Sequence, residues 1–333
     1  QNNEIGLPLT LLRLSPDHRA AVLEMGMYAG GEIADLARMA RPRIGVVTAV
    51  QGVHLSRMGS VAAIEKAKGE LVEALPSDGV AVLNADDRRV RRMAERTAAR
   101  VLLYGFSADA DVAAEDVTAL GFSGMRFTLR LPASAASGGR PVRLQAAIPG
   151  LGKLSVHNAL AGAAVGHAAG IAPQAIGQAL AAGWSAARRA QVIRLGGITL
   201  IDDSYNASPA SVTAALDLLA GLPGRRVAVL GEMLELGDGS AAGHREVGVA
   251  AAATVDLLVT VGKGAAGIAA GAKEAGLDAT RVVEVHDRDA AFDLLLRRLR
   301  DGDVALVKAS RGVELDKVVD ALRASLAKPA RRS

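Results

Sequence analysis

Short apolar runs alternate with helical patterns along almost the whole sequence, and this alternation constrains the fold more than any other feature. In the first half we expect buried strands at residues 21–25, 44–48, 80–84 and 101–104, and helices at 31–40 and 60–75, the latter capped by Ser60. In the second half, runs at 198–202, 226–230, 257–261, 282–285 and 304–307 each precede a helical stretch, the last at 313–326. Repeated βα units build a mainly parallel sheet covered by helices, so we expect an α/β fold.

One interruption of this pattern and one change of spacing indicate how the chain is divided. Residues 113–148 alternate between apolar and polar side chains around a Gly/Ser/Ala-rich turn at 137–139, which predicts a small antiparallel excursion. Alanine-rich helices are expected at 155–170 and 173–181, and a new series of strands begins after Arg189. We therefore expect one domain over residues 1–188 and a second, doubly wound domain over 189–333.

Composition narrows the class of protein. With 333 residues, half of them apolar, the chain is long enough for two domains that each bury a core. The net charge of +4 comes from arginines scattered among acids, which does not indicate a nucleic-acid partner. The chain has no cysteine, which excludes disulfides and fits a reducing cytosol, and no stretch long enough to span a membrane. We expect a cytoplasmic protein, and because the sequence starts at Gln1 without a methionine, a fragment of a longer one.

Acidic and imidazole side chains follow the first two predicted strands. Glu24 ends the first apolar run, and His54 lies in the loop after the second. Ligands of open α/β sheets gather at the carboxyl ends of strands, where a glutamate and a histidine can bind Mg²⁺ or Mn²⁺. The alternative is an exposed glutamate and a loop histidine without a ligand. Lys68, on the helix that follows, taken alone indicates an ordinary solvated charged face.

A second group of polar residues follows the strands of the second half. Residues 202–209, Asp-Asp-Ser-Tyr-Asn-Ala-Ser-Pro, place two acids at a strand end and a proline at a helix start, where a nucleotide could bind. Helix capping is the alternative. Residues 231–237 occupy the same kind of position after the next strand, with His244 downstream. The sequence contains neither a G-x-x-x-x-G-K-[ST] phosphate loop nor a G-x-S-x-G elbow.

In order and spacing, these segments resemble the Mur ligases, in particular the type that adds D-alanyl-D-alanine to a UDP-linked muramoyl tripeptide. In the first half the resemblance rests on residues 2–10, 22–26 with 31–33, 54–55 with 59–60, 67–70 and 84–87. In the second half it rests on residues 202–209, 230–237 with His244, and 306–311. It implies that residues 1–188 form the central ATP-binding domain and residues 189–333 a Rossmann-like ligase domain.

The resemblance also implies a reaction and its partners. ATP would transfer its γ-phosphate to the terminal carboxylate of UDP-N-acetylmuramoyl-tripeptide, and the amine of D-alanyl-D-alanine would attack the resulting acyl phosphate. Two Mg²⁺ ions would neutralise the phosphate charge. The enzyme would act as a monomer in peptidoglycan precursor synthesis.

Site roles are carried over from the resemblance residue by residue. Glu24 and His54 would bind Mg²⁺, together with Lys68 carbamylated by CO₂, because a carbamate converts a cation into a carboxylate-like ligand. The residues implied to contact ATP are Asn158, Arg189, Asp203 and Asn206. The residues implied to contact the substrates are Asn2, Asn3, Lys308, Ser310 and Arg311.

The resemblance leaves two alternatives open. The family's phosphate loop and UDP-binding domain would precede Asn2, so we expect the chain as given to be inactive by itself. A naturally shortened relative that binds nucleotide or muropeptide without catalysis would have the same sequence features. A Mur-type ligase for a different amine is the other alternative.

Overall fold

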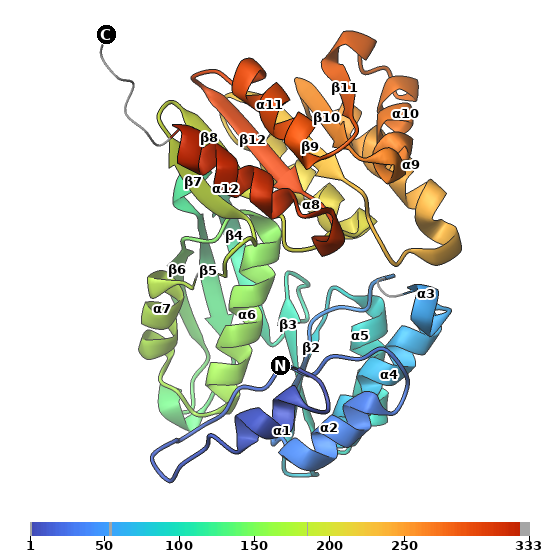
Figure 1. Cartoon of the computed structure of the whole chain (residues 1–333). Coiled ribbons are helices and arrows are strands. Elements are labelled where there is room, and N and C mark those ends of the chain that lie inside the picture. The colour runs from blue at the N-terminus through green and yellow to red at the C-terminus, as the bar shows by residue number, and fades with distance from the viewer. Residues whose placement is uncertain (1, 53–54, 185, 327–333) are drawn as a thin grey trace. The chain divides into compact units, whose positions relative to one another are not determined.

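The computed structural model describes residues 2–52, 55–184 and 186–326 and divides into two compact units. The first unit comprises residues up to 118 together with 126–148 and 155–183. The second comprises residues 119–125 and 149–154 and continues from Trp184 onwards. Both units combine a six-stranded sheet with helices, which confirms the predicted α/β class (Figure 1). Within the described residues, none of the helices combines the length and apolar composition that a bilayer crossing requires.

The sheet of the first unit follows chain order. Its strands are β1 (Ile44–Val47), β2 (Val80–Asn84), β3 (Arg100–Gly105), β4 (Val112–Ala119), β5 (Met125–Leu131) and β6 (Val142–Ile148), each beside the next. Strands β1 to β4 pair in parallel, with Ile44 opposite Val80 and Val80 opposite Arg100. The connections after β4 and β5 are too short for a crossover, so these neighbours form hairpins and confirm the predicted antiparallel excursion.

The helices of the first unit are α1 (Gly6–Leu11), α2 (Glu32–Ala40), α3 (Leu55–Met58), α4 (Val61–Glu73), α5 (Arg88–Arg92), α6 (Gly152–Ala168) and α7 (Pro173–Ala182). Ser60 caps α4 as predicted, since its side chain accepts a hydrogen bond from the amide of Ala63. Helices α4 and α5 bury apolar side chains such as Ile64 and Val90 against Leu83 of β2. Helix α6 begins three residues before the expected position 155.

The strand predicted at residues 21–25 is wrong. This segment is neither helix nor strand, and Val22 is 96% exposed. A short apolar run becomes a strand only when a neighbouring strand satisfies its amides and carbonyls. Among the described residues β1 pairs with β2 alone, and the amide of Gly26 donates instead to the carbonyl oxygen of Asn2. The prediction of a frayed tail at 327–333 lies outside the described residues.

The second unit contains the predicted doubly wound sheet. Its strands are β7 (Gln191–Leu195), β8 (Ile198–Asp202), β9 (Arg225–Gly231), β10 (Leu257–Val261), β11 (Val282–Val285) and β12 (Asp303–Lys308). They lie in the order β11-β10-β9-β12-β8-β7, and every pair is parallel except β7 with β8. Strand β7 was not predicted. Because it lies at an edge, only Leu195 of its five residues is buried, and the strand leaves a weak apolar pattern.

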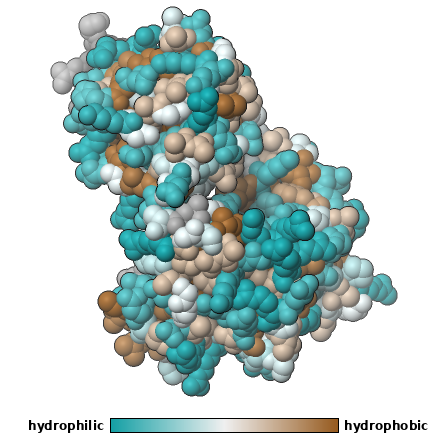
Figure 2. Space-filling view, turned by 90° about the vertical axis from the view of Figure 1, so that its right-hand side faces the viewer, coloured by the Kyte–Doolittle hydropathy of each residue, from teal (hydrophilic) through white to brown (hydrophobic). Residues whose placement is uncertain are grey.

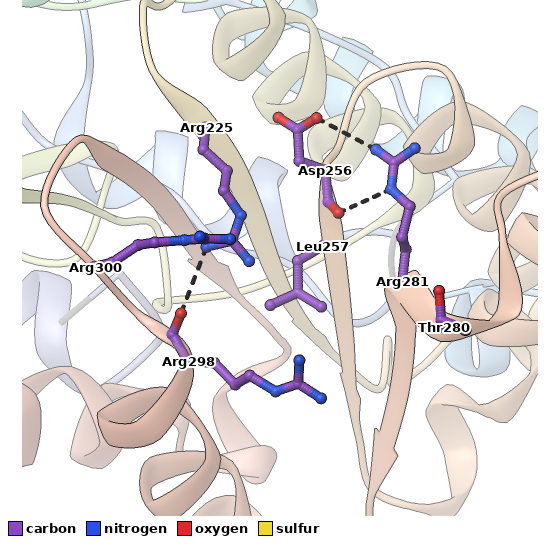
Figure 3. Close-up of a pocket in the computed structure, with 7 residues that line it drawn as sticks. All are labelled: Arg225, Asp256, Leu257, Thr280, Arg281, Arg298 and Arg300. Atoms are coloured by element: carbon purple, nitrogen blue, oxygen red, sulfur yellow. Dashed lines mark hydrogen bonds and ion pairs between the residues drawn. The ribbon is translucent and has the colours of Figure 1, made fainter.

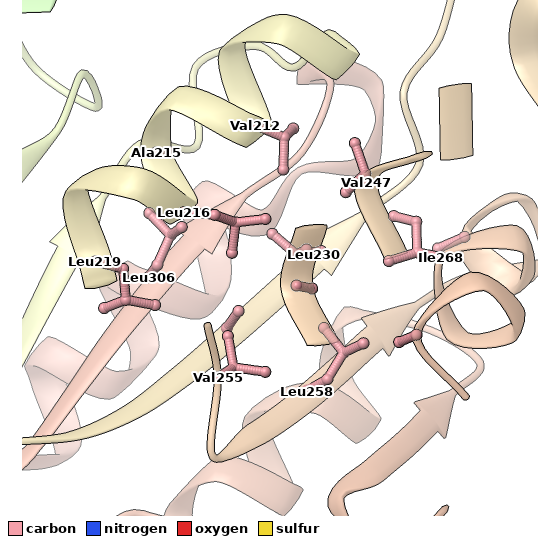
Figure 4. Packing of buried hydrophobic residues seen from close by; sticks show 14 of the residues in the cluster. Val212, Ala215, Leu216, Leu219, Leu230, Val247, Val255, Leu258, Ile268 and Leu306 are labelled. Carbon is pink, nitrogen blue, oxygen red and sulfur yellow. The ribbon is translucent and has the colours of Figure 1, made fainter. Parts of the chain in front are cut away.

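Helices cover both faces of this sheet. They are α8 (Pro209–Ala220), α9 (Ser240–Ala252), α10 (Ala266–Glu274), α11 (Arg288–Arg298) and α12 (Leu315–Leu326). Ala228 and Leu230 of β9 pack with α8, α9 and α10 (Figure 4), whereas Val227 and Val229 pack with α11 and α12. Successive side chains of a strand point to opposite faces, so burial of both faces explains the uninterrupted apolar runs in the sequence.

Helices α9 and α10 approach each other so closely that glycine is required at their contact. A Cβ added to Gly248 would lie 2.1 Å from the carbonyl oxygen of Ile268, and one added to Gly271 would lie 2.3 Å from that of Arg245. Both neighbours are backbone atoms, which cannot rotate away. The small residues of α9 and α10 therefore set the spacing of these helices.

We predict that Gly248→Ala destabilises the protein even though alanine is the better helix former. Overpacking of this kind costs about 1–3 kcal/mol, measurable as a lower urea midpoint. Gly162→Ala in α6 is the control, since nothing lies within 4 Å of its added Cβ. That substitution should stabilise by roughly 0.5–1 kcal/mol. Equal effects of the two substitutions would contradict the close packing of α9 and α10.

Candidate active site

The centre of the second sheet contains a topological switch point. Strands β9, β10 and β11 follow one another outward in one direction, whereas β12 and β8 lie on the other side of β9. Loops that leave neighbouring strands in opposite directions open a crevice at the carboxyl ends, where open α/β sheets bind ligands. The segments that begin at Asp203, Glu232 and Ala309 leave β8, β9 and β12 at this edge.

An ion pair with a buried ammonium joins the segment after β8 to the end of β12. The ammonium of Lys308 lies 2.6 Å from Asp203 Oδ2 and donates to the carbonyl oxygen of Asn206 at 2.9 Å. Lys308 is 4% exposed, and the amide of Asp203 donates to the carbonyl oxygen of Val307. Removing one partner of such a pair leaves an uncompensated charge, which is strongly destabilising. The pair therefore fixes the Asp203–Asn206 turn on the end of β12.

The turn after β8 also binds the chain around Arg189. The amide of Tyr205 donates to the carbonyl oxygen of Arg188, and the amide of Ala190 donates to Asp203 Oδ1, both at 3.1 Å. Arg188 and Ala190 have φ angles of 63° and 50°, a left-handed conformation that non-glycine residues rarely adopt. Arg189 thus projects from a short loop held at both ends.

Two guanidinium groups gather over one aromatic ring. The guanidinium carbon of Arg189 lies 4.4 Å from the centre of the Tyr205 ring, and that of Arg311 lies 5.9 Å from it. All three side chains are exposed, as is Asn206. Cation–π attraction orders these cations while leaving their N–H groups free for an anion. The N-terminus of α8, capped by Ser208, follows in the same turn.

The two acids at the end of β8, Asp202 in the strand and Asp203 directly after it, have different environments. Asp202 is buried, and its Oδ1 accepts hydrogen bonds from the amide of Ser204 at 3.1 Å and from its hydroxyl at 2.5 Å. Burial raises the pKa of Asp202, whereas the hydrogen bonds from Ser204 act in the opposite direction. Asp202 therefore shapes the turn, and Asp203 is the acid that faces the Arg189 loop.

Residues after β9 connect to the end of β12 through the backbone. The hydroxyl of Ser310 accepts from the amide of Leu234 at 2.8 Å, and its own amide donates to the carbonyl oxygen of Glu232. The Nε2 of His244 accepts from the amide of Met233 at 2.9 Å, so Nδ1 carries the proton that is donated to the Ser240 carbonyl. Ser310 and His244 are almost completely buried and serve to hold these loops.

In the first unit, Lys68 lies at the carboxyl edge of the sheet. Its ammonium donates to the carbonyl oxygen of Ala49 at 2.7 Å, and burial lowers its pKa while Asp87 acts in the opposite direction. Asp87 accepts from the amide of Val50 and caps α5. Glu70, two residues further along α4, accepts hydrogen bonds from the amides of Gly31 and Ala34 at the start of α2.

The predicted residues near the N-terminus form a separate small network. The side-chain amide of Asn2 donates to Glu24 Oε1 at 2.9 Å, and Asn3 Oδ1 accepts from the amide of Gly6 at the start of α1. His54 lies outside the described residues. In the part of the chain that the structure describes, Glu24 pairs with Asn2 and Lys68 with the carbonyl of Ala49, and no group of three acids or histidines is placed to hold a metal ion.

Asn158 is exposed on α6, and its neighbour His157 belongs to a cluster that the sequence did not predict. His157 Nε2 lies 3.5 Å from Asp86 Oδ2, and the imidazole packs edge-on against Phe106 at 4.5 Å between ring centres. Burial lowers the pKa of His157, and the negative charge of Asp86 acts in the opposite direction. Asp86 also accepts from the amides of Phe106 and Ser107. Its position after β2, in the Asn84–Asp87 segment, was the available signal.

Comparison with known proteins agrees with this arrangement of two units. Residues 1–166 match the Mur ligase middle domain, and residues 188–311 match the Mur ligase glutamate ligase domain. The chain is 40% identical over 344 residues to the UDP-N-acetylmuramoyl-tripeptide–D-alanyl-D-alanine ligase of Mycobacterium tuberculosis, covering 96% of this chain and 66% of that one. It is 37% identical over 330 residues to the Escherichia coli ligase of the same name, covering 97% and 69%.

Solved structures are similar as well. MurF from Acinetobacter baumannii superposes with a TM-score of 0.86 at 27% identity, covering 96% of this chain and 68% of that chain. MurF ligase from Thermotoga maritima in complex with ADP gives 0.83 at 25% identity, covering 98% and 72%. The chain belongs to the Mur ligase family. Within that family the similarity is to the D-alanyl-D-alanine-adding ligases, and the chain spans about two thirds of the length of these curated relatives.

We predict that Arg188→Gly is less destabilising than Arg188→Ala. Both remove the guanidinium that contacts Asp320 at 2.9 Å and Asp316 at 3.5 Å, but only glycine adopts a φ of 63° without strain. The glycine variant should be more stable by roughly 1 kcal/mol in urea unfolding, since a left-handed Cβ costs about that much. Equal stability of the two variants would mean that the loop before Arg189 is not held in this conformation.

Proposed function

We propose that the chain is the central and C-terminal part of an ATP-dependent ligase that joins D-alanyl-D-alanine to UDP-N-acetylmuramoyl-tripeptide in peptidoglycan precursor synthesis. The main support is its similarity, over 96% of its length, to relatives that carry this name. The convergence of Arg189, Asp203, Asn206 and Arg311 at the carboxyl edge of the second sheet is the structural support. We expect the enzyme to act as a monomer in the cytoplasm.

ATP is the proposed ligand of this edge. Arg189 and Arg311 would bind phosphate oxygens, since guanidinium groups donate to phosphate in a fixed fork geometry. Each oxygen of Asp203 already accepts one hydrogen bond. A carboxylate has about four acceptor sites, so Asp203 could also accept a hydrogen bond from a hydroxyl group of the nucleotide. Asn206 would add an exposed amide. Asn158 of α6 is proposed as a further ATP contact by similarity alone.

The contacts of Lys308 and Ser310 favour positioning roles. Both are buried, and their polar groups hold the turns after β8 and β9 in place. They would therefore act on substrate binding through Asp203, Asn206 and Leu234. Arg311, which is exposed, is the residue of this segment proposed to contact substrate directly. Asn2 and Asn3 are proposed to border the same substrates from the N-terminal segment.

The chemistry requires a carboxylate to become an electrophile. Transfer of the γ-phosphate to the peptide carboxylate forms a carboxyl–phosphate bond and releases ADP. The amine of D-alanyl-D-alanine then attacks the carbonyl carbon, phosphate leaves, and the nitrogen loses a proton. The positive groups at the edge of the second sheet would stabilise the charge that develops on phosphate oxygens.

Two Mg²⁺ ions are proposed to accompany the nucleotide, held by Glu24, His54 and a carbamylated Lys68. Glu24 offers an exposed oxygen donor, and the partly buried Lys68, which donates to the carbonyl of Ala49, would add carbamate oxygens, so the donor types fit a hard cation. An ammonium cannot bind a cation. Attack of the neutral amine on CO₂ forms an N–C bond, releases one proton and gives an anionic oxygen ligand. When bound, Mg²⁺ would neutralise phosphate charge.

We predict that a full-length protein containing this chain releases phosphate with ATP, the muramoyl tripeptide and D-alanyl-D-alanine, and not with single amino acids. Arg189→Ala should raise the KM for ATP about 10- to 100-fold, the effect of losing a charged hydrogen bond. Arg323→Ala, which removes an exposed arginine of α12, should leave it unchanged. Turnover with single amino acids alone would refute the proposed substrate.

We predict that Lys68→Ala abolishes turnover of the full-length protein and that a short carboxylic acid partly restores it. With ¹³C-labelled bicarbonate, a carbamate signal should be visible by NMR in the wild type and in Lys66→Ala, and absent in Lys68→Ala. The signal should weaken as pH falls through the lowered pKa of Lys68, because the protonated amine does not react with CO₂. Wild-type rates from Lys68→Ala would show that no carbamate is needed.

A further inference from the structure

A pocket of about 480 Å³ opens at the amino-terminal edge of the second sheet, opposite the candidate active site. Arg225 is the first residue of β9, while Asp256 and Arg281 directly precede β10 and β11. Strand β9 has seven residues, so the two edges are roughly 20 Å apart. The pocket is therefore separate from the loops around Arg189 and Lys308.

Arginines dominate the lining. Arg225, Arg281, Arg298 and Arg300 line the pocket together with a single acid, Asp256. They come from the start of β9, the turn before β11, the end of α11 and the turn before β12. Figure 3 shows the side chains of Arg225 and Arg300 meeting in the view, with the side chain of Arg298 extending below them. The space-filling view also shows broad hydrophilic cover on the face it displays (Figure 2).

Structural contacts already occupy the acids of this region. Asp256 accepts from the amide of Arg226 at 2.8 Å and lies 3.3 Å from the guanidinium of Arg281. Arg281 also donates to the carbonyl oxygens of Val255 and Asp256. Buried Asp303 binds Arg225 at 2.8 Å. These pairs explain why Arg225 and Arg281 are present, and they engage both Asp256 and Asp303.

Arg298 and Arg300 are not explained in this way. Among the residues that the structure describes, neither of these two guanidinium groups forms a hydrogen bond or an ion pair. A basic residue in the last turn of α11 compensates the helix dipole, but Arg297 already does so from outside the pocket. Guanidinium groups that line one pocket repel one another unless an anion lies between them.

We propose that this pocket binds a small polyanion that carries two or more linked phosphate groups. Guanidinium groups approaching from separate segments can each bind phosphate oxygens in a bidentate manner, and their net charge suits a di- or triphosphate. The volume lies in the range of small-molecule sites. The anion would join the end of α11 to the starts of β9 and β12, far from the reacting groups.

The test is isothermal titration of inorganic tripolyphosphate into the Arg189→Gln protein, which weakens the candidate active site. Tripolyphosphate should bind this protein, and adding Arg298→Gln with Arg300→Gln should lower its affinity at least tenfold. Arg297→Gln is the matched control, because Arg297 lies in the same turn of α11 without lining the pocket. It should leave the affinity unchanged.

Titration with ATP in the same background identifies the source of the phosphates. An equal loss for ATP and tripolyphosphate in the double variant assigns the pocket to the phosphate chain itself. A loss for ATP alone assigns it to nucleotides, and both results support a polyphosphate site. Unchanged affinities in the double variant would overturn the proposal. A loss with Arg297→Gln as large as with the double variant would also overturn it, by indicating diffuse surface charge.

Discussion

The ion pair between Lys308 and Asp203 is the interaction on which the candidate active site depends. It joins the ends of β8 and β12, which are neighbours in the second sheet, and the same ammonium holds the carbonyl of Asn206. Asp203 also accepts a hydrogen bond from the amide of Ala190, so the loop that presents Arg189 is bound to the same ion pair. Because the ammonium is buried, water cannot replace the carboxylate at low cost.

The ion pair between Lys308 and Asp203 also sets the position of the aromatic ring beside it. Tyr205 occupies the turn between Asp203 and Asn206, and its ring lies against both Arg189 and Arg311. A turn that moved would carry the ring away from the two guanidinium groups. Family membership and the position of this turn at a topological switch point therefore agree on where a nucleotide is expected.

The sequence predicted the second sheet well because parallel strands buried on both faces leave uninterrupted apolar runs, as in residues 226–230. It failed for residues 21–25 and for β7, where pairing and edge position decide the outcome and the local pattern does not. Ser60 and Pro209 were predictable from capping chemistry. The left-handed conformation of Arg188, the burial of Asp202 and the contacts of Ser310 depend on distant segments. The metal site at Glu24, His54 and Lys68 stays a prediction.

A double-mutant cycle on Asp203 and Lys308, read out as ADP affinity by calorimetry, tests the central claim most directly. If the pair organises the nucleotide site, Asp203→Asn and Lys308→Met should each weaken ADP binding about tenfold or more. The double variant should then bind ADP no more weakly than the worse single variant, a coupling of about 1.4 kcal/mol or more. Losses that simply add would show that the two residues act independently and would contradict this account.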